Sequence, residues 1–272
     1  MISHARKSLI QLICLLFFIP SFANAEETLR FGVYPHLPSR DLERVYSPIA
    51  EAFSSALKKP VSFESSSSFE NFNDRLDQDS FDIVFVQPFD YIRIADAYGY
   101  RPLAMRGEEL YTVFAVKADS QIKTIQDLKG KKLSLPASIA AVSRLAKHHL
   151  IENGISPSKD VTIRNRRSHM SCLQQVIINQ AHACATADPV LRFFEGKMKL
   201  KLRTVGKSMS IPHTLFAVHP RMSKAQQEIL TKTILDWPNN KEGKKILARG
   251  KLKPFQAIKD ADYDVVRNLK AK

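Results

Sequence analysis

Short apolar runs alternate with amphipathic stretches along most of the chain. Residues 29–33, 61–64 and 81–86 have the composition of strands, and the last run is almost continuously apolar, as strands buried on both faces of a parallel sheet are. Residues 40–57 carry apolar side chains at a spacing near 3.6 and predict a helix. This alternation predicts an α/β fold.

The middle of the chain repeats the pattern. Predicted strands cover residues 132–135, 161–163 and 183–187, and predicted helices cover residues 139–153 and 170–179. Ligands of open α/β sheets bind beyond the carboxyl ends of the strands. The candidate ligand-binding loops are therefore those at residues 34–40, 87–91, 136–138, 168–169 and 188.

Two further apolar runs suggest that the chain passes twice between two lobes. Residues 111–117 leave the first half of the protein, and residues 213–219 read as a strand that returns to it as their partner, so the segment between them looks inserted. We expect a two-lobed α/β fold in which residues 26–113 and 211–272 form lobe 1 and residues 114–210 form lobe 2. A chain with two crossovers can hinge and close on a ligand.

The N-terminus has the features of a secretory signal peptide. Arg6 and Lys7 precede an apolar run at residues 9–19, and Ala23-Asn24-Ala25 matches the A-x-A cleavage pattern. The alternative is a membrane anchor, but the run is shorter than the roughly 20 residues that a spanning helix needs. We therefore expect a signal peptide at residues 1–25 and a periplasmic mature protein.

The chain is strongly basic, with 41 Lys and Arg against 27 Asp and Glu and a net charge of +14. Without the leader, 39 basic and 27 acidic residues leave +12. Such an excess could serve nucleic acid, an anionic membrane surface or small anions. The basic residues are scattered and have no aromatic residues between them, which disfavours nucleic acid. Most of these residues are explained by a solvated basic surface, although the excess positive charge would also raise the local concentration of small anions.

Two cysteines remain after cleavage, Cys172 near the start of one predicted helix and Cys184 in the strand that follows it. At about 1.5 Å per helical residue they should lie on the order of 10 Å apart, which is too far for a disulfide. We expect two buried thiols. An enzyme could use Cys184 as nucleophile with His182 or His169 as base, but a thiol inside an apolar strand is usually inert.

Several short motifs follow one another in a specific order along the chain. They are Phe31-Gly32-Val33-Tyr34-Pro35, Tyr46-Ser47-Pro48, the run at residues 82–91, Asp127-Leu128-Lys129-Gly130-Lys131, Ser168-His169, Ile211-Pro212-His213, and the closing segments at 242–247 and 262–264. Together these motifs resemble the periplasmic phosphate/phosphite/phosphonate-binding proteins of ABC transporters, which have the type II periplasmic-binding fold. The resemblance covers nearly all of residues 26–272.

This resemblance implies a monomeric solute-binding protein, without enzymatic activity, cofactor or metal, that delivers a small anion to an ABC transporter permease. The alternative is that the protein presents its ligand to a membrane sensor kinase. One departure bears on the ligand. Where the family has a Ser-Thr-Ser-Gly cradle at a helix start, this chain has Ser138-Ile139-Ala140-Ala141 and keeps one hydroxyl. We therefore expect weak phosphonate binding and a diverged anion specificity.

The candidate ligand-binding residues combine loop position with the resemblance. They are Tyr34, His36, Gln87, Tyr91, Ser138, Ser168, His169 and Asp188. Structural alternatives exist for four of them. Tyr91 could cap the end of the sheet, while Ser138, His169 and Asp188 could cap helices.

Overall fold

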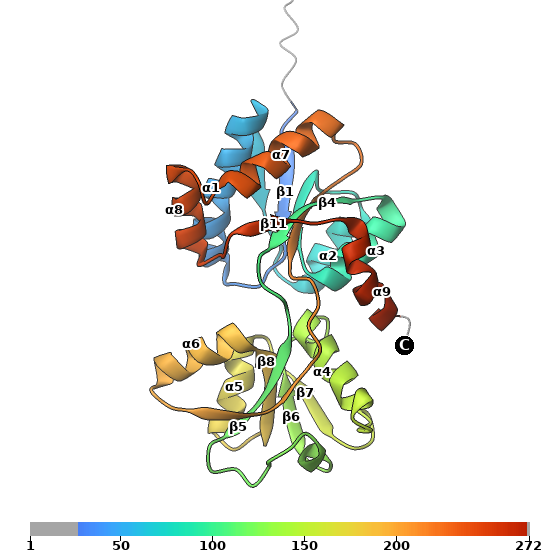
Figure 1. Ribbon diagram of the computed structural model, residues 1–272, viewed down its shortest axis with the longest axis vertical. Coiled ribbons are helices and arrows are strands. Elements are labelled where there is room, and N and C mark those ends of the chain that lie inside the picture. The colour runs from blue at the N-terminus through green and yellow to red at the C-terminus, as the bar shows by residue number, and fades with distance from the viewer. Residues whose placement is uncertain (1–26, 271–272) are drawn as a thin grey trace, which may run out of the picture.

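The computed structural model describes residues 27–270, which form a mixed α/β protein with two lobes (Figure 1). The expected fold class is confirmed. The expected signal peptide at residues 1–25 lies outside the described residues. Within residues 27–270, no helix is both long enough and apolar enough to cross a membrane.

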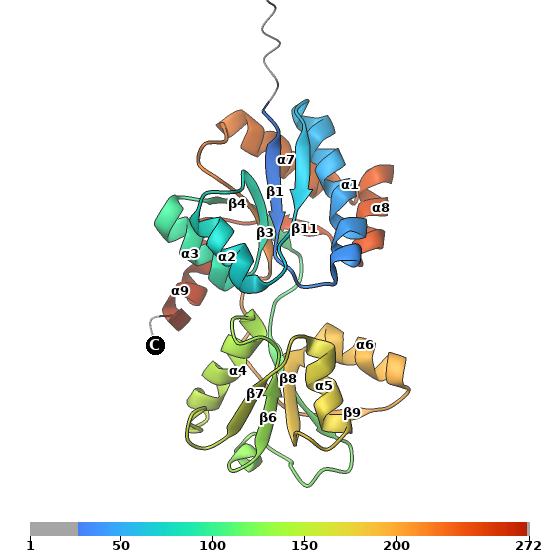
Figure 2. The same cartoon turned by 180° about the vertical axis from the view of Figure 1, so that it is seen from behind.

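The first lobe is built on a six-stranded sheet. Its strands follow the order β11-β4-β10-β3-β1-β2, in which β1 is parallel to β2 and β3, and β10 is antiparallel to β3 and β4. Helices α1, α7 and α8 gather on one side of this sheet and α2, α3 and α9 on the other (Figures 1 and 2). The bounds are β1 Leu29–Val33, α1 Ser39–Leu57, β2 Val61–Glu64, α2 Phe69–Asp77, β3 Ile83–Val86, α3 Pro88–Tyr98, β4 Arg101–Arg106, β10 Leu215–Val218, α7 Lys224–Asp236, α8 Lys241–Gly250, β11 Phe255–Ala257, η2 Asp260–Tyr263 and α9 Asp264–Lys270.

The second lobe is built on a five-stranded sheet in the order β7-β6-β8-β5-β9. Helix α4 packs on one face of this sheet, and helices α5 and α6 pack on the other. An apolar core lies between the sheet and the helices on each face. The bounds are β5 Thr112–Lys117, η1 Gln126–Leu128, β6 Lys132–Leu135, α4 Ala141–Glu152, β7 Thr162–Asn165, α5 His169–Ile177, β8 Ala183–Ala187, α6 Asp188–Met198 and β9 Leu202–Lys207.

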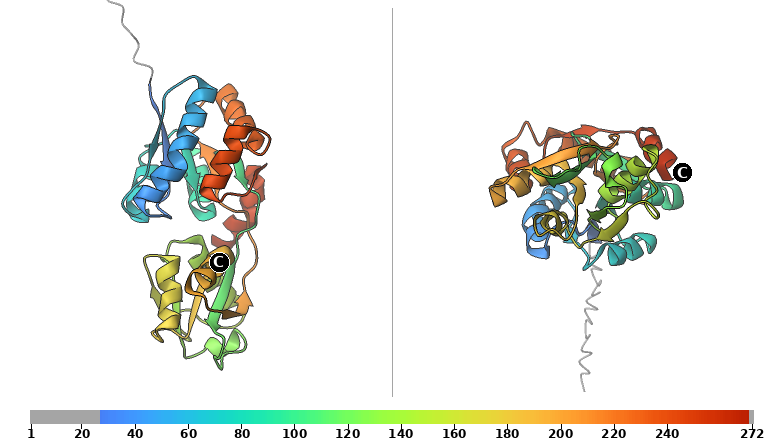
Figure 3. Two further views of the ribbon diagram at one scale, coloured as in Figure 1. Left: turned by 90° about the vertical axis from the view of Figure 1, so that its left-hand side faces the viewer. Right: turned by 90° about the horizontal axis from the view of Figure 1, so that it is seen from below.

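The chain passes between the lobes from β4 to β5 and again from β9 to β10. The two connecting segments run side by side (Figure 3), and Leu110 and Ile211 exchange two backbone hydrogen bonds of 2.9 Å between them. As expected, residues 111–117 and 213–219 flank the two crossings, since β5 joins the second sheet and β10 lies between β3 and β4 of the first. The expected lobe boundary after residue 113 falls inside β5, since Val113 pairs with Thr186 of β8.

The core of the first lobe is aromatic. The rings of Phe85 and Phe216, on adjacent strands, have centroids 4.8 Å apart, and Trp237 and Phe31 pack on the Phe216 ring. Gly32 of β1 has no side chain because a Cβ there would lie 2.6 Å from the ring of Phe81. Large rings thus occupy the space beside this strand.

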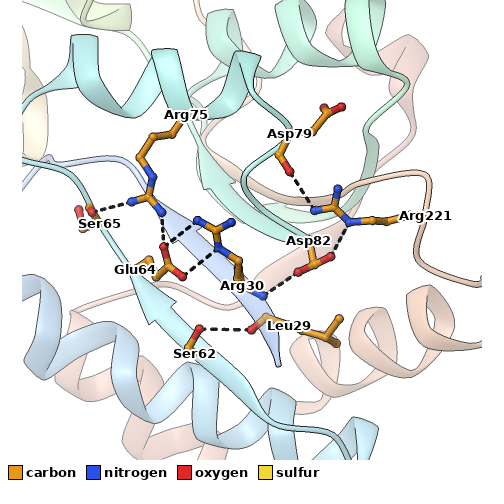
Figure 4. Close-up of polar contacts among 9 residues, drawn as sticks. All are labelled: Leu29, Arg30, Ser62, Glu64, Ser65, Arg75, Asp79, Asp82 and Arg221. Atoms are coloured by element: carbon orange, nitrogen blue, oxygen red, sulfur yellow. Dashed lines mark hydrogen bonds and ion pairs between the residues drawn. The ribbon is translucent and has the colours of Figure 1, made fainter. Parts of the chain in front are cut away.

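Ion pairs neutralise part of the basic excess at the start of β1 (Figure 4). Glu64 of β2 forms ion pairs with Arg30 of β1, at 3.1 Å, and with Arg75 of α2. Asp82 accepts the backbone N–H of Arg30 at 2.7 Å and the Nε of Arg221 at 2.6 Å. These contacts tie β1 to β2, to α2 and to the residue before β3.

Cys172 and Cys184 form a disulfide, with Cα atoms 5.8 Å apart and an S–S distance of 2.08 Å. The expected pair of thiols is therefore wrong, although both residues are buried as expected. Helix α5 packs along β8, and the extended chain after the helix rises about 3.3 Å per residue against about 1.5 Å in the helix. A few residues therefore bring Cys184 back level with Cys172. The disulfide also removes the thiol that the enzyme alternative requires.

Candidate functional site

Loops from both sheets meet where the first turn of α4 contacts the first lobe. The backbone N–H of Ala141 donates to Oε1 of Gln87 at 3.0 Å, and the guanidinium of Arg144 lies 4.9 Å from the ring centroid of Phe89. Ala140, Ala141, Val142 and Leu145 belong to the same buried apolar cluster as the first lobe's core. Gln87, in the predicted loop 87–91, is thus in contact with the helix start that follows the predicted loop 136–138.

Gln87 stands at the junction. It precedes α3, whose first residue Pro88 has no N–H to satisfy and a backbone suited to a helix start. The side chain of Gln87 donates through Nε2 to Oδ2 of Asp90 at 2.9 Å, and both residues are at most 4% exposed. Burial raises the pKa of the Asp90 carboxyl, which Gln87 and the cations Arg93 and Arg144 partly offset.

Ser138 does not cap α4, so that expectation is wrong. The helix begins at Ala141, its N-cap is Ala140, and no side chain bonds the cap. Ser138 is exposed in a preceding turn that the N–H of Ala140 closes on the carbonyl of Ala137 at 3.0 Å. The turn shifts the helix start by two residues relative to the predicted one and separates Ser138 from it. A ligand-binding role for Ser138 stays a prediction.

Tyr34 and His36 form an aromatic pair in the loop after β1. Their rings stack with centroids 4.4 Å apart, and His36 Nδ1 lies 3.0 Å from the carbonyl of Tyr34. That carbonyl can only accept, so Nδ1 carries the proton and Nε2 accepts from the Tyr46 hydroxyl at 3.3 Å. Burial lowers the pKa of His36 to about 4, with Arg106 and His169 adding to the shift. His36 is therefore neutral, and both of its nitrogens already have partners.

Ser168 and His169 lie at the start of α5 in the second lobe. Ser168 caps the helix, because its Oγ accepts the N–H of Ser171 at 3.2 Å while its own N–H donates to Ser171 Oγ at 3.1 Å. The predicted capping role thus falls to Ser168 and not to His169. His169 Nδ1 lies 2.7 Å from Thr186 Oγ1 on β8, and burial lowers the pKa of this imidazole to about 4.

The side chains of Tyr91 and Asp188 form hydrogen bonds and ion pairs with residues outside the predicted set. The hydroxyl of Tyr91 donates to Asp260 at 2.6 Å, and its ring lies 4.8 Å from that of Tyr263, so it binds the C-terminal segment. Asp188 is the first residue of α6, and the N-cap is Ala187. Its carboxylate accepts from the Tyr111 hydroxyl at 3.1 Å and pairs with Arg192.

Three residues that sequence reasoning did not select lie beside Tyr34 and His36. They are Arg106, His213 and Thr214, and the backbone N–H of Arg106 donates to the carbonyl of Thr214 at 3.0 Å. Arg106 was missed because residues 101–106 have no strand-like alternation. His213 belonged to the motif Ile211-Pro212-His213, which was a usable signal.

The tautomer of His213 follows from its contacts. Nδ1 accepts the backbone N–H of Thr214 at 2.7 Å, so the proton of the neutral imidazole is on Nε2. Burial lowers the pKa of His213 well below its usual value, and the neighbouring Arg106 and His36 lower it further. His213 can therefore act as a neutral hydrogen-bond donor.

Comparison with known proteins supports the resemblance seen in the sequence. Residues 31–263 match the family model described as "ABC transporter, phosphonate, periplasmic substrate-binding protein". A binding protein component of an ABC phosphonate transporter from Pseudomonas aeruginosa has a similar structure, with a TM-score of 0.76 and 18% identity, over 90% of this chain and 86% of that one.

Two further solved structures share the fold. A Prochlorococcus marinus protein in complex with methylphosphonate matches with a TM-score of 0.77 and 16% identity, over 90% of this chain and 98% of that one. A Xanthomonas citri protein bound to ATP matches with a TM-score of 0.74 and 18% identity, over 90% and 96% of the two chains. The family match spans most of the sequence, and the chain therefore belongs to the periplasmic substrate-binding proteins of phosphonate ABC transporters.

Proposed function

We propose that the protein is exported by a cleaved signal peptide at residues 1–25 and works in the periplasm as a monomer. There it captures a small oxyanion of the phosphonate, phosphite or phosphate kind between its lobes and delivers it to the permease of an ABC transporter. Lobe 1 comprises residues 26–113 and 211–272, and lobe 2 comprises residues 114–210, except that the two residues at the start of β5, Thr112 and Val113, belong to lobe 2. Family membership supports the general role, and the residues between the lobes support an oxyanion.

One observation carries the proposal. Loops that follow strands of both sheets approach each other where Gln87 bonds the first turn of α4, and the loop after β1 and the start of α5 contribute the neutral imidazoles of His36 and His169. His169 and His213 each keep Nε2 for a ligand, because Nδ1 is engaged with Thr186 and Thr214. Neutral donors beside a cation suit an oxyanion, which needs several hydrogen bonds once it leaves water.

The histidines add a consequence for binding. A bound anion favours the charged form of a nearby imidazole and so raises its pKa. Because His36 and His169 titrate near pH 4 without a ligand, anion binding at pH 5–6 should be accompanied by proton uptake. A cationic or neutral ligand would not cause this uptake.

A thermal-shift screen of the mature chain tests the function. Phosphate, phosphite, methylphosphonate, sulfate and carboxylates are compared, followed by calorimetry in two buffers of different ionisation enthalpy. We expect stabilisation by at least one oxyanion, with proton uptake at pH 5–6. Stabilisation only by neutral or cationic solutes would refute the proposal. Light scattering and small-angle X-ray scattering with the stabilising anion test the monomer and the lobe movement.

A further inference from the structure

We infer that Arg106 and Glu108 form the subsite that selects the anion, and that they select a tetrahedral oxyanion which still carries a proton. Monoprotonated phosphate, phosphite or phosphonate would fit, and sulfate would not. This inference rests on the proposed function and adds to it the residues and the chemical class.

The N–H of Ala141, the first residue of α4, is already engaged. The carboxamide of Gln87 accepts the Ala141 N–H at 3.0 Å and is held in turn by Asp90 at 2.9 Å. Gln87 and Asp90 are only 4% and 2% exposed, so this contact is buried. A ligand placed on that N–H would have to displace a buried hydrogen bond between the lobes. The residues Ile139 and Ala140, which precede the helix, offer no hydroxyl in compensation.

Arg106 and Glu108 instead combine an unpaired donor and an unpaired acceptor within one ion pair. One guanidinium nitrogen of Arg106 pairs with one carboxylate oxygen of Glu108. The remaining atoms, Arg106 Nε and Glu108 Oε2, are buried and have no hydrogen-bond partner within residues 27–270. The side chains keep 22% and 15% of their exposure, so they border solvent. Buried polar atoms without partners cost free energy, which a ligand with matching groups would recover.

The chemistry of the two unpaired atoms, Arg106 Nε and Glu108 Oε2, defines the ligand. Arg106 Nε–H can only donate, so it requires an acceptor such as an anionic oxygen. Glu108 Oε2 belongs to a carboxylate and can only accept, so it requires a donor and repels an oxygen without a proton. A monoprotonated phosphorus oxyanion supplies both an O⁻ and an O–H. Sulfate has no proton near neutral pH and would leave Glu108 opposed by a negative oxygen.

The neighbours of this pair fit the same ligand. Arg106 is bonded through its backbone to Thr214, and the adjacent His213 carries its proton on Nε2. The backbone of His213 is fixed by the Tyr263 hydroxyl, which donates to its carbonyl at 2.7 Å. Asp188, the carboxylate among the predicted ligand-binding residues, binds Tyr111 and Arg192 through a single oxygen, Oδ2. Glu108 differs in that its second oxygen, Oε2, is buried and has no hydrogen-bond partner within residues 27–270.

Calorimetry with phosphate, methylphosphonate and sulfate at pH 6.5 tests the inference. The unmodified protein should bind the better phosphorus oxyanion at least about tenfold more tightly than sulfate. Glu108→Gln replaces an acceptor-only group by one that also donates, so it should weaken the phosphorus oxyanion and improve sulfate, which reduces the ratio about tenfold or more. The matched control is Glu109→Gln, an exposed neighbour that should change neither affinity.

Arg106 is tested in the same way. Arg106→Met should weaken all three oxyanions by about 10- to 100-fold, while Arg101→Met, at the exposed opposite end of β4, should leave them unchanged. If Arg106→Met does not fold by circular dichroism, Arg106→Lys keeps a cation for Glu108 but loses the Nε–H, and it should still weaken binding at least about tenfold.

The outcomes separate this inference from the proposed function. No binding of any oxyanion by the unmodified protein would refute the function. Tight binding of a phosphorus oxyanion, with the selectivity against sulfate unaffected by Glu108→Gln or the affinity unaffected by the Arg106 variant, would leave the function intact and overturn the inference. Sulfate binding as tight as that of phosphate by the unmodified protein would also overturn it.

Discussion

Reduction of the Cys172–Cys184 disulfide should destabilise the second lobe by a predictable amount. The bond closes a loop with a sequence separation of 12 residues. In the chain-entropy account, a loop of this size removes about 10 cal/mol/K from the unfolded state, which is worth about 3 kcal/mol at 25 °C. If the mature chain, residues 26–272, unfolds as one cooperative unit, about 3 kcal/mol corresponds to a fall of about 6–12 °C in Tm.

The same bond should matter for the ligand. Cys172 lies on α5 one turn after His169, and Cys184 lies on β8 two residues before Thr186. The disulfide therefore pins together the two elements that hold the His169–Thr186 hydrogen bond of 2.7 Å. Reduction should lower the affinity for the stabilising anion by loosening His169, in addition to its effect on Tm.

Calorimetric melting with and without a phosphine reductant measures the first effect, and titration with the anion measures the second. The double variant Cys172→Ala with Cys184→Ala should melt like the reduced protein and should not respond to reductant. Because Cys14 lies in the expected leader, the mature chain has no other cysteine. An unchanged Tm on confirmed reduction of the bond would refute the reasoning.

Three further predictions concern single contacts. Burial lowers the pKa of His36 and His169 to about 4 from a usual value near 6.5, so the unfolded chain binds more protons than the folded chain between these pH values. The stability contributed by the two neutral imidazoles should therefore be complete above pH 6.5. As the pH falls toward 4, the free energy of unfolding should decrease by up to about 1.4 kcal/mol per pH unit for each histidine. His169→Gln should reduce this slope in urea titrations, and an identical slope would contradict the assignment. Tyr91→Phe removes the donor to Asp260 and should cost about 0.5–1.5 kcal/mol of stability without changing anion affinity; a large loss of affinity would mean that Tyr91 reaches the ligand. Gly32→Ala, whose Cβ would meet the Phe81 ring at 2.6 Å, should cost about 1–3 kcal/mol in denaturant unfolding, and a neutral result would show that the ring can move.

The sequence alone determined the fold class and the family, because both depend on local pattern. The apolar run at residues 81–86 became the buried central strand β3, and the periodic residues 40–57 became α1. The connections after β1, β3 and β7 are predicted from the rule that ligands bind at the carboxyl ends of strands, and they hold Tyr34, Gln87 and, at the first position of α5, His169. Such features need only the spacing of apolar residues and the order of motifs.

The tertiary structure alone decided which distant residues meet. Cys172 and Cys184 come together because α5 packs back along β8, and a count of helical rise contains no information on that packing. The hydroxyl of Tyr91 donates to Asp260, 169 residues away in sequence, and not to a residue of its own loop. Arg106 and His213 became neighbours because β10 inserts beside β4, a long-range antiparallel pairing that neither segment signals. Contacts between segments far apart in the chain depend on how the sheets assemble, and periodicity within one segment does not determine that assembly.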